Sequence, residues 1–310
     1  MTVNMETAMR TLLVLALGFL VASAAGAAES GTPEPAVMRA VLVTGASAGI
    51  GRKVTEKLAA AGFHVFAGAR KPQDIEALSA VPNVTGVRLD VNSAADVAAA
   101  VELVHASGHA LHGLVNNAGV AVIDPVLSTT DEDFDFQMQA NVYGVFRVTK
   151  AFAPLVIAAR GRILNVSSIS AFLSDPATAA YTMSKLAVEG FTNVLANELA
   201  PRGVAVIAIE PGAYNTDILK PALERSNTKG FSADRSTMKP PDEVAAAVLL
   251  ALTEPKPKRR YMVVPERAQA EETIRGALEM AVQLNADQPY SYDRTALIRL
   301  LDESSAKVRQ

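Results

Sequence analysis

The sequence predicts an α/β protein: a single doubly wound domain with a seven-stranded parallel sheet and helices on both faces. Short apolar runs alternate with segments of helical periodicity from about residue 39 to residue 265. The runs are almost free of charge, as in strands that are buried on both faces of a parallel sheet. Half of the 310 residues are hydrophobic, and no change of composition divides the alternating region, so one core is expected.

The expected strands each end at a glycine, a polar residue or a turn. They are Ala40–Thr44, His64–Gly68, Val87–Leu89, Leu111–Val115, Arg162–Val166, Val204–Ile209 and Arg260–Val264. The helices expected between them cover residues 50–61, 93–107, 130–159, 177–200 and 241–252. Pro154 predicts an interruption of the third helix. Ser93 and Asp96 resemble a capping box at the start of the second.

Composition and charge exclude several classes of protein. The chain has 29 Lys and Arg against 32 Asp and Glu, so it lacks the basic surface that nucleic-acid binding requires. It has no cysteine, which excludes disulfides, thiolate metal sites and thiol nucleophiles. His105, His109 and His112 flank Gly108, a predicted helix end, so their side chains should diverge and no metal site is predicted.

We divide the chain into a leader with a linker (1–37), a domain of alternating strands and helices (38–266) and a helical C-terminal extension (267–310). The leader contains an apolar run over residues 11–28 that suits a cleaved signal or an uncleaved membrane anchor. It could equally be an extension upstream of a true start at Met38. We expect a cytoplasmic or cytoplasm-facing protein, with export left open.

A glycine-rich turn follows the first strand and opens the first helix. Thr44–Gly51 reads T-G-A-S-A-G-I-G, and glycines let a backbone turn tightly and approach a ligand. The free N–H groups of the helix N-terminus attract a pyrophosphate. The cofactor-binding residues predicted here are Gly45, Ser47, Ala48, Gly49, Ile50 and Gly51.

Three later strands end in residues that suit the rest of a dinucleotide, because open sheets bind ligands at the carboxyl ends of their strands. Arg70 suits a ribose 2′-phosphate, which favours NADP(H) over NAD(H). Asp90 and Val91 are placed to contact the adenine. The small residues of the N-N-A-G segment that follows the fourth strand would leave room for the cofactor, and they are Asn117, Ala118 and Gly119.

Tyr181 and Lys185 are one helical turn apart and share a helix face. An ammonium group, together with an oxidised nicotinamide, would favour the phenolate of a tyrosine, whose pKa is normally near 10. Tyr181 could then exchange a proton with a substrate hydroxyl or carbonyl. Lys185 could also hydrogen-bond the nicotinamide ribose.

Together these motifs resemble the short-chain dehydrogenase/reductase family, whose fold is a Rossmann-type domain. The matching segments are T-G-A-S-A-G-I-G (44–51), D-V (90–91), N-N-A-G (116–119), N-V-Y-G (141–144), V-S-S-I-S (166–170), Y-T-M-S-K (181–185) and P-G-A-Y-N-T (211–216). The match spans roughly residues 39–265. Ala48 departs from many NADP-preferring members, which carry a basic residue there, so Arg70 alone supports the preference for NADP.

The resemblance implies a catalytic tetrad of Asn141, Ser168, Tyr181 and Lys185. Ser168, favoured over neighbouring Ser167, would hold the substrate oxygen, and Asn141 would hold a water that links Lys185 to solvent. The resemblance also places Tyr214 and Thr216 beside the nicotinamide end of the cofactor.

We therefore expect an NADP-dependent oxidoreductase that transfers a hydride between nicotinamide and a carbonyl or alcohol substrate. The alternatives are an NADPH-binding sensor without turnover and a membrane-tethered structural partner. The segment 214–240 is expected to form a lid over the substrate. By resemblance, the long helices at about 130–159 and 177–200 would form a homodimer or homotetramer contact.

Overall fold

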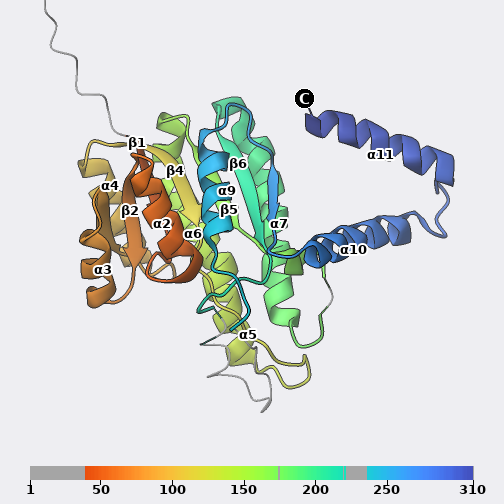
Figure 1. Cartoon of the computed structure of the whole chain (residues 1–310), viewed down its shortest axis with the longest axis horizontal. Coiled ribbons are helices and arrows are strands. Elements are labelled where there is room, and N and C mark those ends of the chain that lie inside the picture. Colours follow the sequence, from red (N-terminus) through yellow and green to blue (C-terminus); the bar gives the residue numbers. More distant parts are fainter. Residues whose placement is uncertain (1–38, 174, 219, 221–235, 310) are drawn as a thin grey trace, which may run out of the picture. The chain divides into compact units, whose positions relative to one another are not determined.

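A parallel sheet of seven strands forms the centre of the protein (Figure 1). The computed structural model describes residues 39–173, 175–218, 220 and 236–309. Every strand pairs in parallel with its neighbours, in the order β3-β2-β1-β4-β5-β6-β7. The strands are β1 (Arg39–Val43), β2 (His64–Ala69), β3 (Val84–Arg88), β4 (Ala110–Asn116), β5 (Arg162–Val166), β6 (Ala205–Pro211) and β7 (Arg260–Val263).

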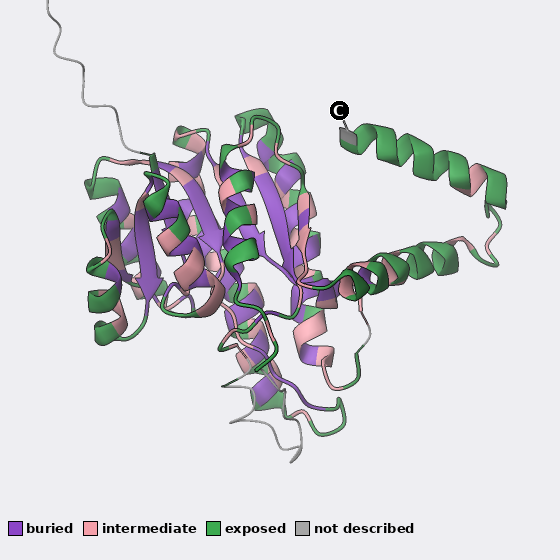
Figure 2. Cartoon of the chain, viewed as in Figure 1, coloured by how far each residue is buried: buried purple, intermediate pink, exposed green. Residues whose placement is uncertain are grey.

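Helices cover both faces of the sheet, which is purple in Figure 2 because its strands are largely buried. The helices are α2 (Gly49–Ala60), α3 (Pro72–Ser79), α4 (Ala94–Ala106), α5 (Asp131–Met138), α6 (Gly144–Ala158), α7 (Ala179–Leu199), α9 (Asp242–Thr253), α10 (Arg267–Asn285) and α11 (Arg294–Arg309). One core cluster joins the sheet to α2, α3 and α9. The other joins it to α4, α6 and α7. The predicted doubly wound fold is confirmed.

Alternation along β1 shows how one strand supplies both cores. Val41 and Val43 belong to the cluster under α2 and α9, whereas Ala40 and Leu42 belong to the cluster under α4 and α6. All four residues are fully buried. A strand that must be apolar on both sides carries no polar alternation, which is why its sequence is a continuous apolar run.

One prediction about a helix was wrong, and one short helix was not predicted. Pro154 does not interrupt α6, which continues to Ala158. Pro154 and Lys150 are both exposed, so water can hydrate the Lys150 carbonyl that loses its partner, while Phe152 and Val156 remain packed on the sheet. The helix that was not predicted is α3, a short helix that begins with a proline at a position where its missing N–H costs nothing.

The C-terminal segment forms two helices, as predicted. Both are largely exposed, and only Thr273 is buried in α10 (Figure 2). None of the helices in the described part of the chain combines the length and the apolar character that a membrane span requires. The predicted leader (1–37) lies outside the described residues, as does most of the predicted lid, namely residue 219 and residues 221–235.

Candidate functional site

Two loops meet where the strand order reverses, between β1 and β4. Such a reversal opens a crevice at the carboxyl ends of the strands, where this class of sheet binds ligands. The Thr44 hydroxyl oxygen accepts hydrogen bonds from the backbone N–H groups of Asn117 (3.0 Å) and Ala118 (2.9 Å). The Asn117 amide donates to the carbonyl oxygens of Thr44 (2.9 Å) and Gly45 (3.1 Å). The two predicted cofactor loops are therefore fixed against each other.

Two glycines make this close approach possible. Gly45 has a φ of 64°, and a Cβ there would lie 2.8 Å from the Ala118 Cα. A Cβ on Gly51 would collide with the Gly45 carbonyl and the Asn117 side chain. A Cβ on Gly49 would meet the Thr216 side chain at 3.3 Å, so Thr216 lies against the glycine turn.

The N-terminus of α2 fits an anionic ligand. Its N-cap is Ala48, whose side chain has no acceptor for the free N–H groups of the first turn. Ser47 and Ala48 are exposed, and Gly49 and Ile50 are partly exposed, so this turn is open to solvent. Because a helix N-terminus carries partial positive charge, the donor set suits a pyrophosphate.

The residues expected to contact the adenosine half of the cofactor follow strands β2 and β3. Arg70 directly follows β2 and is exposed, and its carbonyl accepts a hydrogen bond from Arg88 (3.3 Å). The Asp90 N–H donates to the Asp96 carboxylate (3.2 Å), and the Asp90 carboxylate accepts from the Asn92 N–H (2.9 Å). Asp96, a residue of the predicted capping box, thus holds the loop that contains Asp90.

That cap is formed in part as predicted. The Ser93 hydroxyl oxygen accepts from the Asp96 N–H (3.1 Å), whereas the Asp96 carboxylate contacts Asp90 instead of the Ser93 N–H. The Val91 carbonyl accepts from Arg147 (2.5 Å), a contact from α6 that the sequence analysis omitted.

Tyr181, Lys185 and Ser168 come together at the carboxyl end of β5. Ser168 follows β5, and both other residues lie in the first two turns of α7. Burial raises the pKa of the Tyr181 phenol, and a hydrogen bond with Ser168 lowers it. Lys185 Nζ donates to the Val166 carbonyl (2.9 Å) and lies 5.5 Å from the centroid of the Tyr181 ring.

Burial also acts on Lys185. It lowers the pKa of the ammonium to about 8, against an opposing effect of Glu189. The phenol has a raised pKa although the lysine lies beside its ring. The phenolate expected from the sequence thus needs more positive charge than the described residues provide.

Asn141 lies in a π-helical turn, η1 (Gln139–Tyr143), between α5 and α6. Turns of this kind are frequent at functional sites. Its side chain accepts from the Val120 N–H (2.9 Å) and donates to the Val120 carbonyl (3.0 Å) and the Ser184 hydroxyl (3.1 Å). Gln137 donates to the same Val120 carbonyl (2.9 Å) and to Ser184 (3.3 Å). The sequence analysis singled out neither Gln137 nor Ser184.

Tyr214, which the family resemblance places beside the nicotinamide end of the cofactor, has an internal side-chain partner. It is buried in the core that includes α9, and its hydroxyl donates to Glu243 (2.5 Å). Burial and the Glu243 carboxylate raise the pKa of this phenol. A contact of residue 214 with a cofactor would therefore use its backbone.

Helix α10 contacts two segments, one after strand β6 and one after the 3₁₀ turn that follows strand β5. The Gln269 side chain accepts a hydrogen bond from the Ala213 N–H (3.0 Å), in the loop after β6. Gly276 lies so close to the Phe172 carbonyl that a Cβ would collide with it. Phe172 follows the 3₁₀ turn that begins after Ser168.

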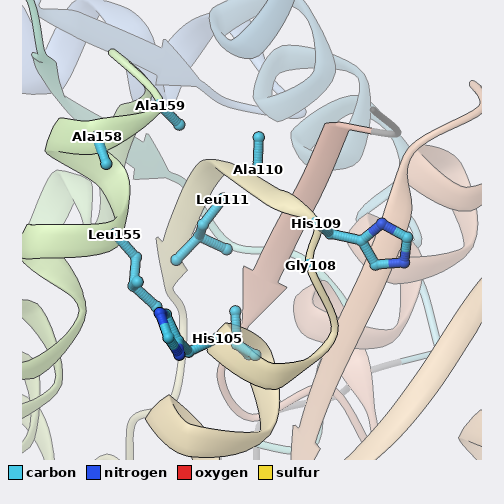
Figure 3. A pocket seen from close by; sticks show the side chains of 9 residues that line it. His105, Gly108, His109, Ala110, Leu111, Leu155, Ala158 and Ala159 are labelled. Atoms are coloured by element: carbon cyan, nitrogen blue, oxygen red, sulfur yellow. The ribbon is translucent and has the colours of Figure 1, made fainter. Parts of the chain in front are cut away.

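The histidines gather away from these residues, near the amino end of β4. His105 and His109 line a shallow pocket beside Gly108 (Figure 3), and their rings lie apart in it. The His109 ring instead lies against the His64 ring, with 4.5 Å between centroids and an angle of 32° between the ring planes. Within the described residues, no group of three potential ligand side chains could hold a metal ion.

Comparison with known proteins identifies the class. The family model described as short chain dehydrogenase matches residues 39–227. An uncharacterized oxidoreductase of Escherichia coli (strain K12), YbbO, is 34% identical over 233 residues, which cover 73% of this chain and 86% of that protein. The chain belongs to the short-chain dehydrogenase/reductase family.

Solved structures agree with this assignment. A family member from Burkholderia phymatum in complex with NAD has a TM-score of 0.70 at 25% identity, covering 82% of this chain and 98% of that one. A short chain dehydrogenase from Burkholderia cenocepacia J2315 in complex with NADP has a TM-score of 0.64 at 30% identity, with 81% and 98% covered. The protein is an enzyme of this family, an NAD(P)-dependent oxidoreductase that acts on alcohol or carbonyl groups.

Proposed function

We propose that this enzyme is NADP-dependent and interconverts a carbonyl and an alcohol, with Tyr181 as the general acid or base. The observation that carries the proposal is the meeting of Tyr181, Ser168 and Lys185 at the carboxyl edge of the sheet that also holds the glycine turn. A bound nicotinamide cofactor supplies or accepts the hydride.

The glycine turn and the α2 N-terminus would hold the pyrophosphate, and Asp90 and Val91 the adenine. Asn117, Ala118, Gly119 and Thr216 would surround the rest of the dinucleotide, and Arg70 would pair with the 2′-phosphate. One of the two structural neighbours above binds NAD and the other NADP, so the preference for NADP is supported by Arg70 alone.

Tyr181 would transfer a proton to or from the substrate oxygen, while Ser168 donates a hydrogen bond to that oxygen and stabilises its developing charge. Lys185 would bind the nicotinamide ribose and favour the phenolate when the positive charge of an oxidised nicotinamide is also present. The raised pKa of Tyr181 keeps the phenol protonated near neutral pH, which suits a proton donor for carbonyl reduction. Asn141 would hold a water on the proton path from Lys185.

A panel of aldehydes and ketones, assayed by NADPH oxidation, tests this function. The wild type should reduce at least one carbonyl, and Tyr181→Phe should lower kcat by about 10²- to 10⁴-fold while still binding NADPH. Activity of Tyr181→Phe equal to that of the wild type would remove Tyr181 as the proton donor. Binding of NADPH without turnover of any carbonyl would favour the sensor alternative.

We further propose a homodimer or homotetramer that uses α6 and α7. Large apolar side chains are exposed on these helices and the turn before α6, and they are Tyr143, Phe146, Met183, Leu186 and Val194. We also propose that the protein is cytoplasmic or faces the cytoplasm and that residues 11–28 act at a membrane. The catalytic domain is proposed to begin after residue 37 and to end at residue 266.

A further inference from the structure

A closed ring of buried hydrogen bonds lies beside the first turns of α7. Gln137 Nε2 donates to the Val120 carbonyl (2.9 Å) and to the Ser184 hydroxyl oxygen (3.3 Å). Asn141, four residues later, donates through Nδ2 to the same two acceptors, at 3.0 Å and 3.1 Å. Each amide group thus bridges the Val120 carbonyl to Ser184, and the three side chains that form the ring are at most 1% exposed.

The acceptor end of each amide fixes its orientation. The Gln137 oxygen Oε1 accepts a hydrogen bond from the Val122 N–H (2.7 Å), and the Asn141 oxygen Oδ1 accepts one from the Val120 N–H (2.9 Å). A flipped amide would place its NH₂ group against these N–H donors, where no hydrogen bond can form. Both NH₂ groups therefore point into the ring.

The ring connects Gln137 to Tyr181 in two ways. The Ser184 hydroxyl uses its one hydrogen on the Tyr181 carbonyl (2.7 Å), one turn earlier in α7. Ala121 and Ile123, which alternate with the two residues that the amides hold, form a small apolar cluster, and the Tyr181 side chain packs against it. Gln137 therefore fixes the backbone of the segment on which Tyr181 rests.

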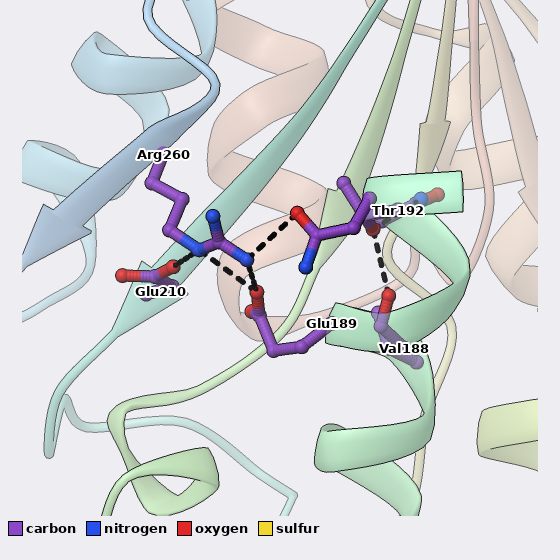
Figure 4. A network of polar contacts seen from close by, with 7 residues as sticks. Val188, Glu189, Thr192, Glu210 and Arg260 are labelled. Carbon is purple, nitrogen blue, oxygen red and sulfur yellow. Dashed lines mark hydrogen bonds and ion pairs between the residues drawn. The ribbon is translucent and has the colours of Figure 1, made fainter. Parts of the chain in front are cut away.

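Helix α7 is also anchored to the sheet at a separate place, by a buried cluster of charges (Figure 4). Arg260 on β7 donates to Glu189 on α7 through Nε (3.1 Å) and Nη2 (2.9 Å), and it lies 3.2 Å from a carboxylate oxygen of Glu210 on β6. The Glu189 and Glu210 side chains are only 7% and 5% exposed. Because this anchor does not involve the ring, a substitution of Gln137 should release the segment 120–123 and leave α7 on the sheet.

We infer that Gln137 is a positioning residue for Tyr181, because it fixes the segment against which the Tyr181 side chain packs. The inference rests on the proposed function, since the position of Tyr181 matters for catalysis only if Tyr181 exchanges the proton. Without the Gln137 amide, the Val122 N–H would lose its acceptor and the Val120 carbonyl would lose one of its two donors. Unpaired buried polar groups are costly, so the segment should move to find other partners.

The test compares wild type with Gln137→Met, which keeps the length of the side chain and removes its donors and its acceptor. Gln139→Met is the matched control, because Gln139 is exposed in the adjoining turn η1. Three quantities are measured on the full chain: kcat for a carbonyl substrate, the dissociation constant of NADPH, and the ¹³Cζ-tyrosine NMR resonance of Tyr181, assigned with Tyr181→Phe.

Gln137→Met should shift or broaden the Tyr181 resonance and lower kcat by about 10- to 100-fold, because a small misplacement of a reacting group is costly. The affinity for NADPH should change little, since the cofactor loop keeps its own hydrogen bonds to Thr44. Gln139→Met should leave all three quantities at their wild-type values.

A Tyr181 resonance that keeps its wild-type shift and width in Gln137→Met would overturn the inference, whatever the activity. A loss of NADPH affinity at unchanged kcat would also overturn it, since Gln137 would then act on the cofactor loop. If the wild type reduces no carbonyl, the proposed function fails, and the resonance still decides whether Gln137 positions Tyr181. If Gln137→Met does not fold, as judged by circular dichroism, Ser184→Ala removes the same bridge at its other end and takes its place with the same expected changes.

Discussion

At the scale of single residues, two glycines that lie in helices have opposite roles. Gly51 lies in the first turn of α2, where a Cβ would collide with the Gly45 carbonyl. Gly190 lies inside α7 and is exposed, with nothing within 4 Å of the position that a Cβ would take.

Gly51→Ala should therefore lower the free energy of unfolding by about 1–3 kcal/mol and weaken NADPH binding. Gly190→Ala should raise the free energy of unfolding by up to about 1 kcal/mol, because alanine favours a helix more than glycine does. Urea unfolding and NADPH titration measure both quantities. Unaltered stability in Gly51→Ala would contradict the tight packing described for the turn.

Arg70 carries the proposed preference for NADP. Replacing it by aspartate would remove a charged hydrogen bond to the 2′-phosphate and add repulsion, so Arg70→Asp should weaken NADPH binding by about 10- to 100-fold. NADH binding should change little, because its ribose carries a hydroxyl instead. Parallel titrations of wild type and Arg70→Asp with both cofactors measure this ratio, and a wild type that prefers NADH would refute the role of Arg70.

The residues of the site fall into two groups: those that belong to short sequence motifs and those whose contacts join separate elements. Gly45, Asn117, Ser168 and Tyr181 belong to short motifs, so their clustering at one sheet edge could be predicted. Gln137, Ser184 and Gln269 act through contacts between separate elements, for example Gln269 with the Ala213 backbone. No local pattern marks a glutamine for such a contact, since it depends on how α10 packs.

At the scale of elements, the same reasoning explains which helices could be predicted. Long helices with strong apolar periodicity, such as α7, were predicted within two residues of their observed ends. The short helix α3 buries only Leu78 and gave no such signal. The interruption predicted at Pro154 does not occur, because a proline breaks a helix only where the freed carbonyl cannot be hydrated and packing does not hold the next turn.

Helix α10 depends on one close approach. Gly276→Ala would push a methyl group into the Phe172 carbonyl, so the helix must shift away from the segment that follows Ser168. We expect a loss of about 1–3 kcal/mol in the free energy of unfolding and a higher KM for the carbonyl substrate. Ala277→Gly, at the neighbouring position, is the control for helix propensity. Wild-type stability and KM in Gly276→Ala would show that α10 does not support this segment.

At the scale of the whole molecule, Glu210 makes stability depend on pH. The folded protein binds the Glu210 proton more tightly than the unfolded chain does, because the pKa rises from its usual value of 4.5 to about 7. Stability from this group is therefore lost as pH rises between these values. Glu210→Gln cannot ionise and escapes this loss.

The stability of Glu210→Gln relative to wild type should rise by up to about 3 kcal/mol between pH 4.5 and pH 8. Urea unfolding at the two pH values measures the change, and Glu198→Gln is the exposed control that should show little of it. An equal difference between Glu210→Gln and wild type at both pH values would contradict the raised pKa of the buried Glu210 carboxyl group.

The account as a whole depends on where the nicotinamide ring binds relative to Tyr181. A crystal structure of the enzyme saturated with NADP⁺ measures this most directly. We predict the pyrophosphate at the N-terminus of α2 and the ring beside the Tyr181 hydroxyl, with Lys185 bonded to the adjacent ribose. A ring bound away from Tyr181, or a crevice left empty at saturating nucleotide, would contradict the proposed reaction.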